Sequence, residues 1–288
     1  MRIIILLTLV VSMYAQKVLL INSNTNIEKY KSVENSFKKS FNKPFETIDI
    51  SKMSKEEIKE YLYDEYPDVV YSIGVKAYQY TNLYIPEKTI FFSSIINYKR
   101  LNLQNNRFGV SNELHAGMNL TIIKSLFFDI KKLNIIYSKY TQDLYESFKE
   151  NAKKLGVEII GEKLFNSSSL NVDKLNISDG LILLPDPILL KDENRVYELF
   201  RKIKQLKKPI FAYDKLFLDY GATLAISAHN PTIGNQIALM IGSHLKNSDF
   251  NNIQIPAGTE VIFNKKVADK LELKYNEFAI SVVDKVIE

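Results

Sequence analysis

The feature that most constrains the fold of this chain is an order of short apolar strands and amphipathic helices that runs twice along it. Each apolar run in the first half has a counterpart in the second. The matching runs begin at Val18 and Asn134, at Asp68 and Asp179, at Thr89 and Pro209, and at Val110 and Leu224. Alternating strands and helices produce parallel sheets with right-handed crossovers. We therefore expect an α/β fold of two Rossmann-like lobes with parallel sheets, joined by a hinge, with a cleft between the strand ends.

The clearest unit of this plan is the stretch Pro67–Tyr80. Its apolar run, Val69–Ile73, ends in a turn that contains Gly74, and a helix-compatible segment begins at about Val75. In parallel sheets, ligands bind beyond the carboxyl ends of the strands. A helix N-terminus at that place favours a carboxylate or a phosphate, because its backbone N–H groups are unpaired.

Two further helices have clear sequence signals. Ser54 followed by Glu57 forms a capping box, which predicts a helix that runs to Tyr63. A second helix is expected over residues 230–245, with small residues on one of its sides at Gly234, Ala238 and Gly242.

The first fifteen residues have the layout of a secretory signal peptide. Arg2 supplies a positive charge, and an apolar core of the right length follows, too short to span a bilayer. The alternative is a buried first strand that continues into Val18–Ile21. No later run contains eighteen consecutive apolar residues, so we expect a mature chain that is not membrane-spanning.

The composition excludes several classes of site. The chain has no cysteine, which excludes disulfides, thiolate metal sites and a lipid-modified cysteine after the signal. An exported product would therefore be free in a periplasm-like space. The net charge of +5 comes from lysines scattered over helical stretches, so no nucleic acid partner is expected.

These observations give a domain plan. Residues 1–15 are the signal peptide. The first lobe comprises residues 16–112 plus about 229–254, and the second comprises residues 113–228 plus about 255–288. The long C-terminal segment is expected to cross back between the lobes.

Five segments in order resemble one known family. They are Pro67–Gln79 (PDVVYSIGVKAYQ; family pattern PDLIVAIGTPAAQ), Ile85–Ile95 (family pattern IPIVFTAV), Arg107–Asn112 (RFGVSN; NVTGVSD), Leu133–Lys139 (LNIIYSK; RIGVLYNP) and Lys208–Asp214 (KPIFAYD; IPVFGSD). The chain thus resembles the periplasmic substrate-binding proteins of ABC transporters, of the tryptophan and tyrosine type, over nearly all of its mature length. The resemblance implies the type I periplasmic-binding-protein fold.

The chain departs from the family pattern at positions in the expected cleft. Val75-Lys76 replaces a threonine or serine followed by proline, and Asn112 replaces an aspartate. Ala228–Pro231 replaces a Gly-x-Asp-Tyr-Tyr pattern. The family's ligand is therefore not carried over to this chain.

The resemblance implies a hinged clamp that binds a small, amino-acid-like ligand between its lobes and delivers it to a permease. We expect a monomer that needs no cofactor and is not an enzyme. Two alternatives remain at this point: a clamp that reports to a sensor kinase, and an exported α/β enzyme. Motifs of nucleophile elbows, phosphate loops and dinucleotide-binding turns are absent from the sequence.

The candidate ligand-binding residues follow the strand ends and the expected crossings. They are Asn22, Ser23, Ser72, Lys76, Ala77, Ser93, Ser94, Asn112, Glu113, Tyr140, Thr141, Asp186, Tyr213, Asp214 and His229. For an amino-acid-like ligand, the amides near Lys76 and the serines would bind the carboxylate. An acid such as Asp186, Asp214 or Glu113 would bind the ammonium group, and Tyr140 or Tyr213 would stack on its apolar body.

Each candidate also has a purely structural interpretation. Asp186 and Asp214 would then cap the helices that follow them, Tyr213 would belong to the core, and Lys76 would be solvated. The three histidines lack metal-ligand spacing, and His229 is expected to form a hydrogen bond in the hinge or cleft.

Overall fold

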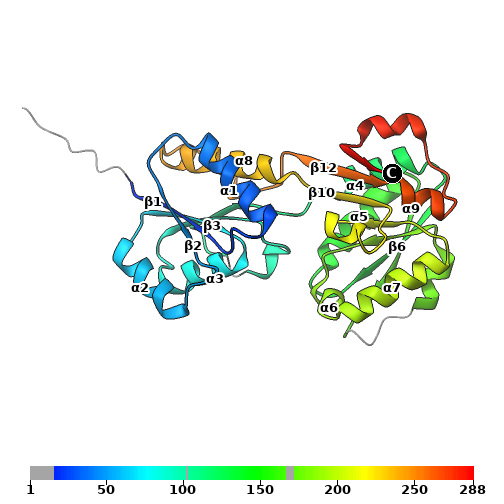
Figure 1. Cartoon of the computed structure of the whole chain (residues 1–288), viewed down its shortest axis with the longest axis horizontal. Coiled ribbons are helices and arrows are strands. Elements are labelled where there is room, and N and C mark those ends of the chain that lie inside the picture. Colours follow the sequence, from blue (N-terminus) through cyan, green and yellow to red (C-terminus); the bar gives the residue numbers. More distant parts are fainter. Residues whose placement is uncertain (1–15, 102, 167–171) are drawn as a thin grey trace, which may run out of the picture.

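The computed structural model describes residues 16–101, 103–166 and 172–288, which form two α/β lobes side by side (Figure 1). Each lobe is built on one mostly parallel sheet with helices on both faces. The predicted fold class is confirmed. The predicted signal peptide, residues 1–15, lies outside the described residues.

The sheet of the first lobe has the order β11-β5-β4-β3-β1-β2, and all of its neighbouring strands are parallel. Its strands are β1 (Val18–Asn22), β2 (Glu46–Asp49), β3 (Val69–Ile73), β4 (Thr89–Ser93), β5 (Arg107–Val110) and β11 (Ile253–Gln254). Because β11 comes from the C-terminal part of the chain, the tail returns to this lobe, as expected.

The sheet of the second lobe has the order β13-β12-β10-β9-β8-β6-β7. Its strands are β6 (Lys132–Tyr137), β7 (Glu158–Lys163), β8 (Gly180–Leu183), β9 (Ile210–Ala212), β10 (Leu224–Ala228), β12 (Thr259–Asn264) and β13 (Lys285–Ile287). The β10–β12 pair is antiparallel, and the other pairs are parallel.

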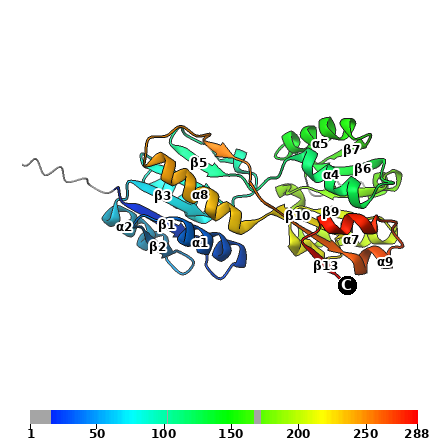
Figure 2. The same ribbon diagram turned by 90° about the horizontal axis from the view of Figure 1, so that it is seen from above.

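Helices cover both faces of each sheet. The helices of the first lobe are α1 (Glu28–Ser40), α2 (Lys55–Glu65), α3 (Val75–Tyr84) and α8 (Asn230–His244). Those of the second lobe are α4 (Ala116–Leu126), α5 (Gln142–Lys154), α6 (Pro187–Leu190), α7 (Glu193–Gln205) and α9 (Lys265–Lys270). In the first lobe, α1 and α8 cover one face and α2 and α3 the other (Figures 1 and 2).

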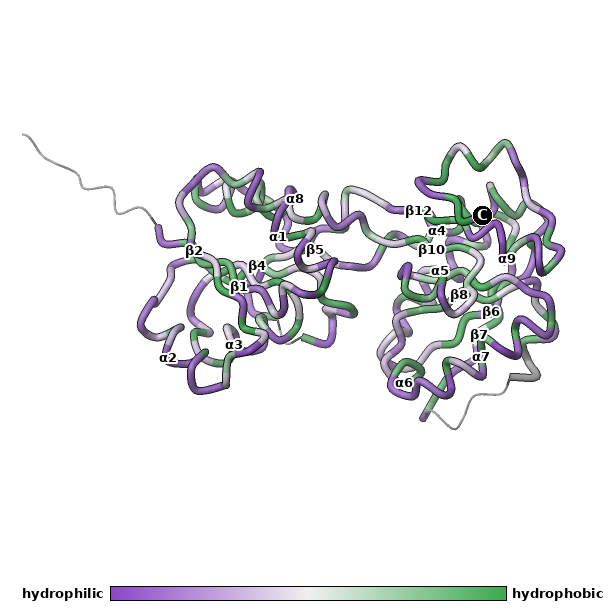
Figure 3. The backbone as a smooth tube through the Cα atoms, viewed as in Figure 1, coloured by the Kyte–Doolittle hydropathy of each residue, from purple (hydrophilic) through white to green (hydrophobic). Residues whose placement is uncertain are grey.

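Burial on both faces explains the continuous apolar runs in the sequence. In β3, Tyr71 and Ile73 pack in the core beneath α1 and α8, whereas Val70 packs in the core with α2 and α3. Every residue of β1 and β3 is buried, as expected for central parallel strands. Figure 3 shows these hydrophobic strands inside each lobe, with hydrophilic residues on the helices around them.

The capping box of α2 is present as predicted. Ser54 Oγ accepts a hydrogen bond from Glu57 N at 3.2 Å, and Glu57 Oε2 accepts one from Ser54 N at 2.8 Å. These two bonds satisfy amides that the first turn of a helix leaves unpaired. The helix ends at Glu65, two residues beyond the predicted end.

The chain crosses between the two sheets after β5, after β10 and after β11. His229 joins two of these crossings, because its backbone N–H donates to the oxygen of Gly258 at 2.9 Å. The return of α8 to the first lobe places it against α1 (Figure 2). The hinge therefore consists of several short segments rather than one linker.

Candidate functional site

A cleft between the lobes is lined by the start of α1, the carboxyl end of β10 and residues of β12 and β13. The cleft has a volume of about 520 Å³. Residues 27–29, at the start of α1, line it from the first lobe, and residues 214–216, 218 and 219, after β9, line it from the second. Asn112, which follows β5, and Ala228, which ends β10, lie at the crossings. Both lobes therefore contribute to one concave surface, and the carboxyl end of β10 is part of it.

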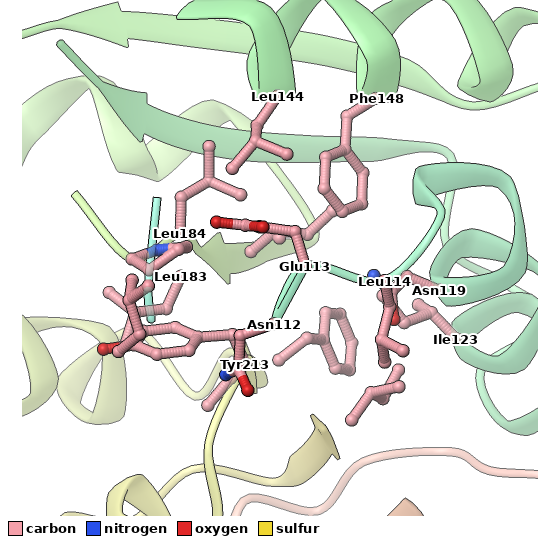
Figure 4. Close-up of a pocket in the computed structure, with 16 residues that line it drawn as sticks. Asn112, Glu113, Leu114, Asn119, Ile123, Leu144, Phe148, Leu183, Leu184 and Tyr213 are labelled. Carbon is pink, nitrogen blue, oxygen red and sulfur yellow. The ribbon is translucent and has the colours of Figure 1, made fainter. Parts of the chain in front are cut away.

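A smaller cavity of about 50 Å³ lies in the second lobe beside this cleft (Figure 4). Its walls come from the ends of β8, β9 and β10 and from α4 and α5, together with the crossing after β5. The apolar lining residues are Ile96, Leu114, Ile123, Leu144, Phe148, Ile182, Leu183, Leu184, Pro185, Phe211, Ala212 and Ile226. Four lining residues carry polar side chains: Asn112, Glu113, Asn119 and Tyr213.

Glu113 extends into this cavity between the apolar walls (Figure 4). Its Oε1 accepts a hydrogen bond from the backbone N–H of Asn97 at 2.5 Å. Its Oε2 is buried and has no hydrogen-bond partner among the described residues. Burial raises the pKa of this carboxyl group, and the nearby amides of Asn97 and Asn112 only partly offset that effect.

Asn97 also ties the two lobes together. Its backbone is in the left-handed region, with φ 54°, and its Nδ2 donates to the oxygen of Tyr140 at 2.6 Å. Lys99 on the same loop forms an ion pair with Asp143 of α5 at 2.8 Å. The loop after β4 therefore holds Glu113 from the first-lobe side.

The first-lobe candidates Asn22 and Ser23 are buried and engaged within the lobe. Asn22 Nδ2 donates to Glu34 at 2.5 Å, and Ser23 Oγ accepts from the backbone N–H of Ala77 at 2.9 Å. The amide of Ala77, which the sequence assigned to a ligand carboxylate, thus already has a partner. Lys76 Nζ donates to the oxygen of Ile50 at 2.6 Å.

The three serine candidates of this lobe differ in their surroundings. Ser72 shares a hydrogen bond with Thr81 at 3.1 Å, and Ser93 shares one with Tyr71 at 2.7 Å, both in the buried interior. Ser94 has a φ of 59°, and its buried Oγ lacks a hydrogen-bond partner in the described part of the chain. Of the three hydroxyl groups, that of Ser94 is the one without a hydrogen-bond partner among the described residues.

Asp186 and Thr141 form a buried structural network in the second lobe. Asp186 is fully buried and accepts hydrogen bonds from Ser138 N at 2.7 Å and Thr141 Oγ1 at 2.5 Å. It also caps α6 by accepting from the amides of residues 188 and 189. The capping interpretation therefore describes Asp186, and its oxygens are already occupied.

Asp214, Tyr140 and Tyr213 lie at the surfaces of the cleft and the cavities. Asp214 lines the cleft and accepts from the amide of Leu216 at 3.0 Å, which caps a short 3₁₀ helix. Tyr213 lines the smaller cavity, and burial raises the pKa of its hydroxyl group. Tyr140 is exposed and lines a second small cavity, to which Glu113 also contributes.

His229 lies where the chain crosses between the lobes after β10. Its Nδ1 shares a hydrogen bond with Thr232 Oγ1 at 2.7 Å at the start of α8. Within the described ranges, no group of three or more histidines and acids could hold a metal ion.

Sequence reasoning missed Asn119, Leu144 and Phe148. These residues come from α4 and α5, and the search followed strand ends and crossings. The helical spacing of Leu144 and Phe148 could have placed both on one face of α5. A helix over residues 116–126 was not predicted.

Comparisons with known proteins place the chain in a family. The family model described as "ABC transporter substrate binding protein" matches residues 23–287. A search of curated proteins found no match. Among the described residues, we find no helix that is both long and apolar enough to cross a bilayer.

Solved structures share the fold at low sequence identity. An ABC domain from Streptococcus pneumoniae, in complex with L-Trp, is 18% identical with a TM-score of 0.67, covering 94% of this chain and 99% of that one. A ligand-free, open substrate-binding protein with adhesive properties from Clostridium difficile is 14% identical with a TM-score of 0.71, covering 95% and 99%. A conserved domain protein from Vibrio cholerae is 17% identical with a TM-score of 0.65, covering 94% and 99%. With its two lobes, its cleft between them and the family match over residues 23–287, the chain belongs to the ABC transporter substrate-binding protein family.

Proposed function

We propose that this protein captures a small, amino-acid-like molecule between its lobes and delivers it to the permease of an ABC transporter. It does so as a monomer in a periplasm-like compartment, after export directed by residues 1–15. The observation that carries the proposal is the cleft of about 520 Å³ lined by residues of both lobes. A ligand that contacts both lobes stabilises their closed arrangement, which a permease can then distinguish from the empty one.

The chemistry of the lining supports an amino-acid-like ligand. The cavity beside the cleft has largely apolar walls and a buried carboxylate at Glu113. Amino acids with apolar side chains combine these two requirements, because each has an ammonium group and an apolar body. The fold relative from Streptococcus pneumoniae is in complex with L-Trp.

A thermal-shift screen of the purified protein tests this function. The panel contains the amino acids, matched amines and carboxylic acids, sugars and nucleobases. A ligand present at 100 times its dissociation constant adds about 2.7 kcal/mol to the free energy of unfolding, which gives a clear rise in melting temperature. We expect apolar amino acids to raise it. A rise with sugars or nucleobases alone would contradict the amino-acid assignment.

An uptake experiment tests delivery. Cells that lack the gene should lose accumulation of the radiolabelled ligand at concentrations near its dissociation constant, and the restored gene should recover it. Unchanged uptake, together with a lost transcriptional response to the ligand, would indicate a sensor partner instead of a permease.

A further inference from the structure

We propose that the cavity beneath α4 and α5 is a subsite for the ammonium group of the ligand, with Glu113 and Asn119 as its acceptors. The protein would thereby select primary amines that carry an apolar body. This inference rests on the proposed function and specifies which end of the ligand enters the second lobe.

Glu113 offers an acceptor that the protein leaves unused. Asn97 N–H occupies Oε1, whereas Oε2 has no hydrogen-bond partner in the ranges that the structure describes. A buried polar atom without a partner costs about 1–3 kcal/mol, and more when it is charged. An ammonium group placed at Oε2 removes this cost and adds a charge-assisted hydrogen bond.

Asn119 supplies a second acceptor from another element. It lies on α4, one turn after the crossing, and lines the same cavity as Glu113 (Figure 4). Its Oδ1 is also buried without a hydrogen-bond partner among the described residues. Either acceptor suits an ammonium group, which carries three donors and no acceptor.

No cationic side chain lines this cavity, although Lys99 and His115 line the neighbouring cavity that Glu113 also borders. None of the residues that line the cavity is a lysine, arginine or histidine. The nearest loop cation that affects Glu113 is Lys99, and Asp143 holds it in an ion pair at 2.8 Å. A cationic group of a ligand in this cavity would therefore meet no competing cation in its walls.

The competing carboxylates are less suited to this role. Asp186 is fully buried and accepts from four donors. Asp214 faces the wider cleft, where water solvates it, and uses one oxygen to cap the following turn. Glu113 combines burial, an unused oxygen and apolar surroundings.

Other ligand groups fit the cavity less well. An apolar group would leave Glu113 Oε2 buried against hydrocarbon, and a ligand carboxylate would be repelled by it. At about 50 Å³, the cavity accepts one small group, since whole small-molecule sites measure about 300–1,000 Å³. Asn112 lines both the cavity and the cleft, so the two spaces adjoin at this residue.

Calorimetric titration with matched probes tests the subsite. The leucine series comprises L-leucine, 3-methylbutylamine, N-acetyl-L-leucine and 4-methylpentanoate, and the phenylalanine series comprises the corresponding four compounds. Within a series, the probes that bear a primary ammonium group should bind at least tenfold more tightly than the acetylated and deaminated ones.

Variants assign this preference to residues. Glu113→Gln keeps the shape and the acceptor for Asn97, and should weaken the binding of amine probes at least tenfold while leaving the deaminated probes within twofold. Asn119→Leu should weaken amine binding severalfold. Glu150→Gln, on the exposed side of α5, is the matched control and should bind all probes as the wild type does.

The results separate this inference from the proposed function. Suppose that the amino acids bind but that Glu113→Gln retains the full preference for amines. The subsite is then wrong, and the proposed function stands. The same holds if Asp214→Asn, rather than Glu113→Gln, removes the preference for amines. If the wild-type protein binds the deaminated probes as tightly as the amines, the subsite is also wrong. If sugars bound and none of the leucine or phenylalanine probes did, both the subsite and the proposed function would be wrong.

A proton readout distinguishes a direct contact from a structural effect. The ammonium group should lower the pKa of Glu113, so amine binding should release protons at pH values below the elevated pKa of this group in the ligand-free protein. Titrations in two buffers of different ionisation enthalpy measure that release, which should vanish in Glu113→Gln. The other charged or titratable groups around Glu113 are Tyr98, Lys99, His115, Tyr140, Asp143 and Tyr213. A release that persists in Glu113→Gln and disappears in His115→Gln would contradict the inference.

Discussion

At the scale of single residues, Asp186 holds the end of β8 to the loop after β6. It accepts from Ser138 N, from Thr141 Oγ1 and from the first amides of α6. Buried bonds to a charged acceptor contribute more than neutral ones, about 1.5–3 kcal/mol each.

Replacing this carboxylate should destabilise the second lobe. We expect Asp186→Asn to lower the free energy of unfolding by about 2–4 kcal/mol in urea denaturation, because the amide cannot accept from all four donors. Asp192→Asn is the control, since Asp192 is half-exposed and caps α7 through one hydrogen bond at 3.2 Å. Asp192→Asn should lower the free energy of unfolding by less than about 1 kcal/mol. If both substitutions lowered the free energy of unfolding equally, the role assigned to Asp186 would be contradicted.

Glu113 should make the ligand-free protein less stable as pH rises. Burial raises its folded-state pKa above the usual 4.5, so the neutral form fits the fold better than the charged one. The cost of the charge is absent below the unfolded-state pKa and grows as pH rises towards and through the folded-state pKa.

We expect Glu113→Gln to melt at a higher temperature than the wild type at pH 8. The difference between the two melting temperatures should become smaller towards pH 4.5. Melting curves across this range, without ligand, make the comparison. A buried binding group often costs stability in this way. A variant less stable than the wild type at pH 8 would show that the charge is well compensated.

At the scale of elements, the contact of α8 with α1 depends on one glycine. A Cβ at Gly234 would lie 2.2 Å from the oxygen of Val33 and 2.9 Å from the nitrogen of Phe37. A Cβ at Gly242, on the same helix, would meet no heavy atom within 4 Å. The two positions looked alike in the sequence.

Alanine substitutions should therefore act in opposite directions. Gly234→Ala should destabilise the protein by about 1–3 kcal/mol, because the helices must separate. Gly242→Ala should stabilise it by up to about 1 kcal/mol through helix propensity. Urea denaturation of both variants measures the difference, and a Gly234→Ala variant as stable as the wild type would refute the close contact.

Most elements could be predicted because central parallel strands are buried on both faces and read as apolar runs. The runs at β1 and β3 are examples, and the capping box of α2 fixed the start of that helix. The helix α4 was missed because His115, rather than a serine, threonine or acid, caps it. The strand β13 was missed because it lies at the edge of the sheet and is partly exposed, so it has no buried apolar run.

The site was harder to predict than the fold. Glu113 and Asn112 were predicted from their place at a crossing, where the chain leaves β5. The hydrogen-bond partners of Ser72 and Ser93 depend on the face of the sheet to which each side chain points. The position of a residue at a strand end does not reveal that face. Asn119 and Phe148 line the cavity because of how α4 and α5 rotate against the sheet, which only packing determines.

At the scale of the whole molecule, the proposed function requires the short crossings between the two sheets to let the lobes close around a ligand. Each lobe has its own sheet, and His229 joins two of the crossings. A hinge of this kind absorbs rotation in a few backbone dihedrals while the lobes keep their packing. The loop that carries Asn97 links this motion to Glu113.

The most direct test of the account is the distance between the lobes with and without ligand. The chain has no cysteine, so Asn26→Cys and Asp219→Cys place spin labels at exposed positions, one beside the cleft in each lobe. Asp219→Cys with Glu150→Cys, both in the second lobe, is the control pair. With the tightest ligand from the thermal-shift screen, pulsed dipolar spectroscopy should give a shorter interlobe distance and an unchanged control distance. An interlobe distance that stays the same at saturating ligand would contradict the clamp.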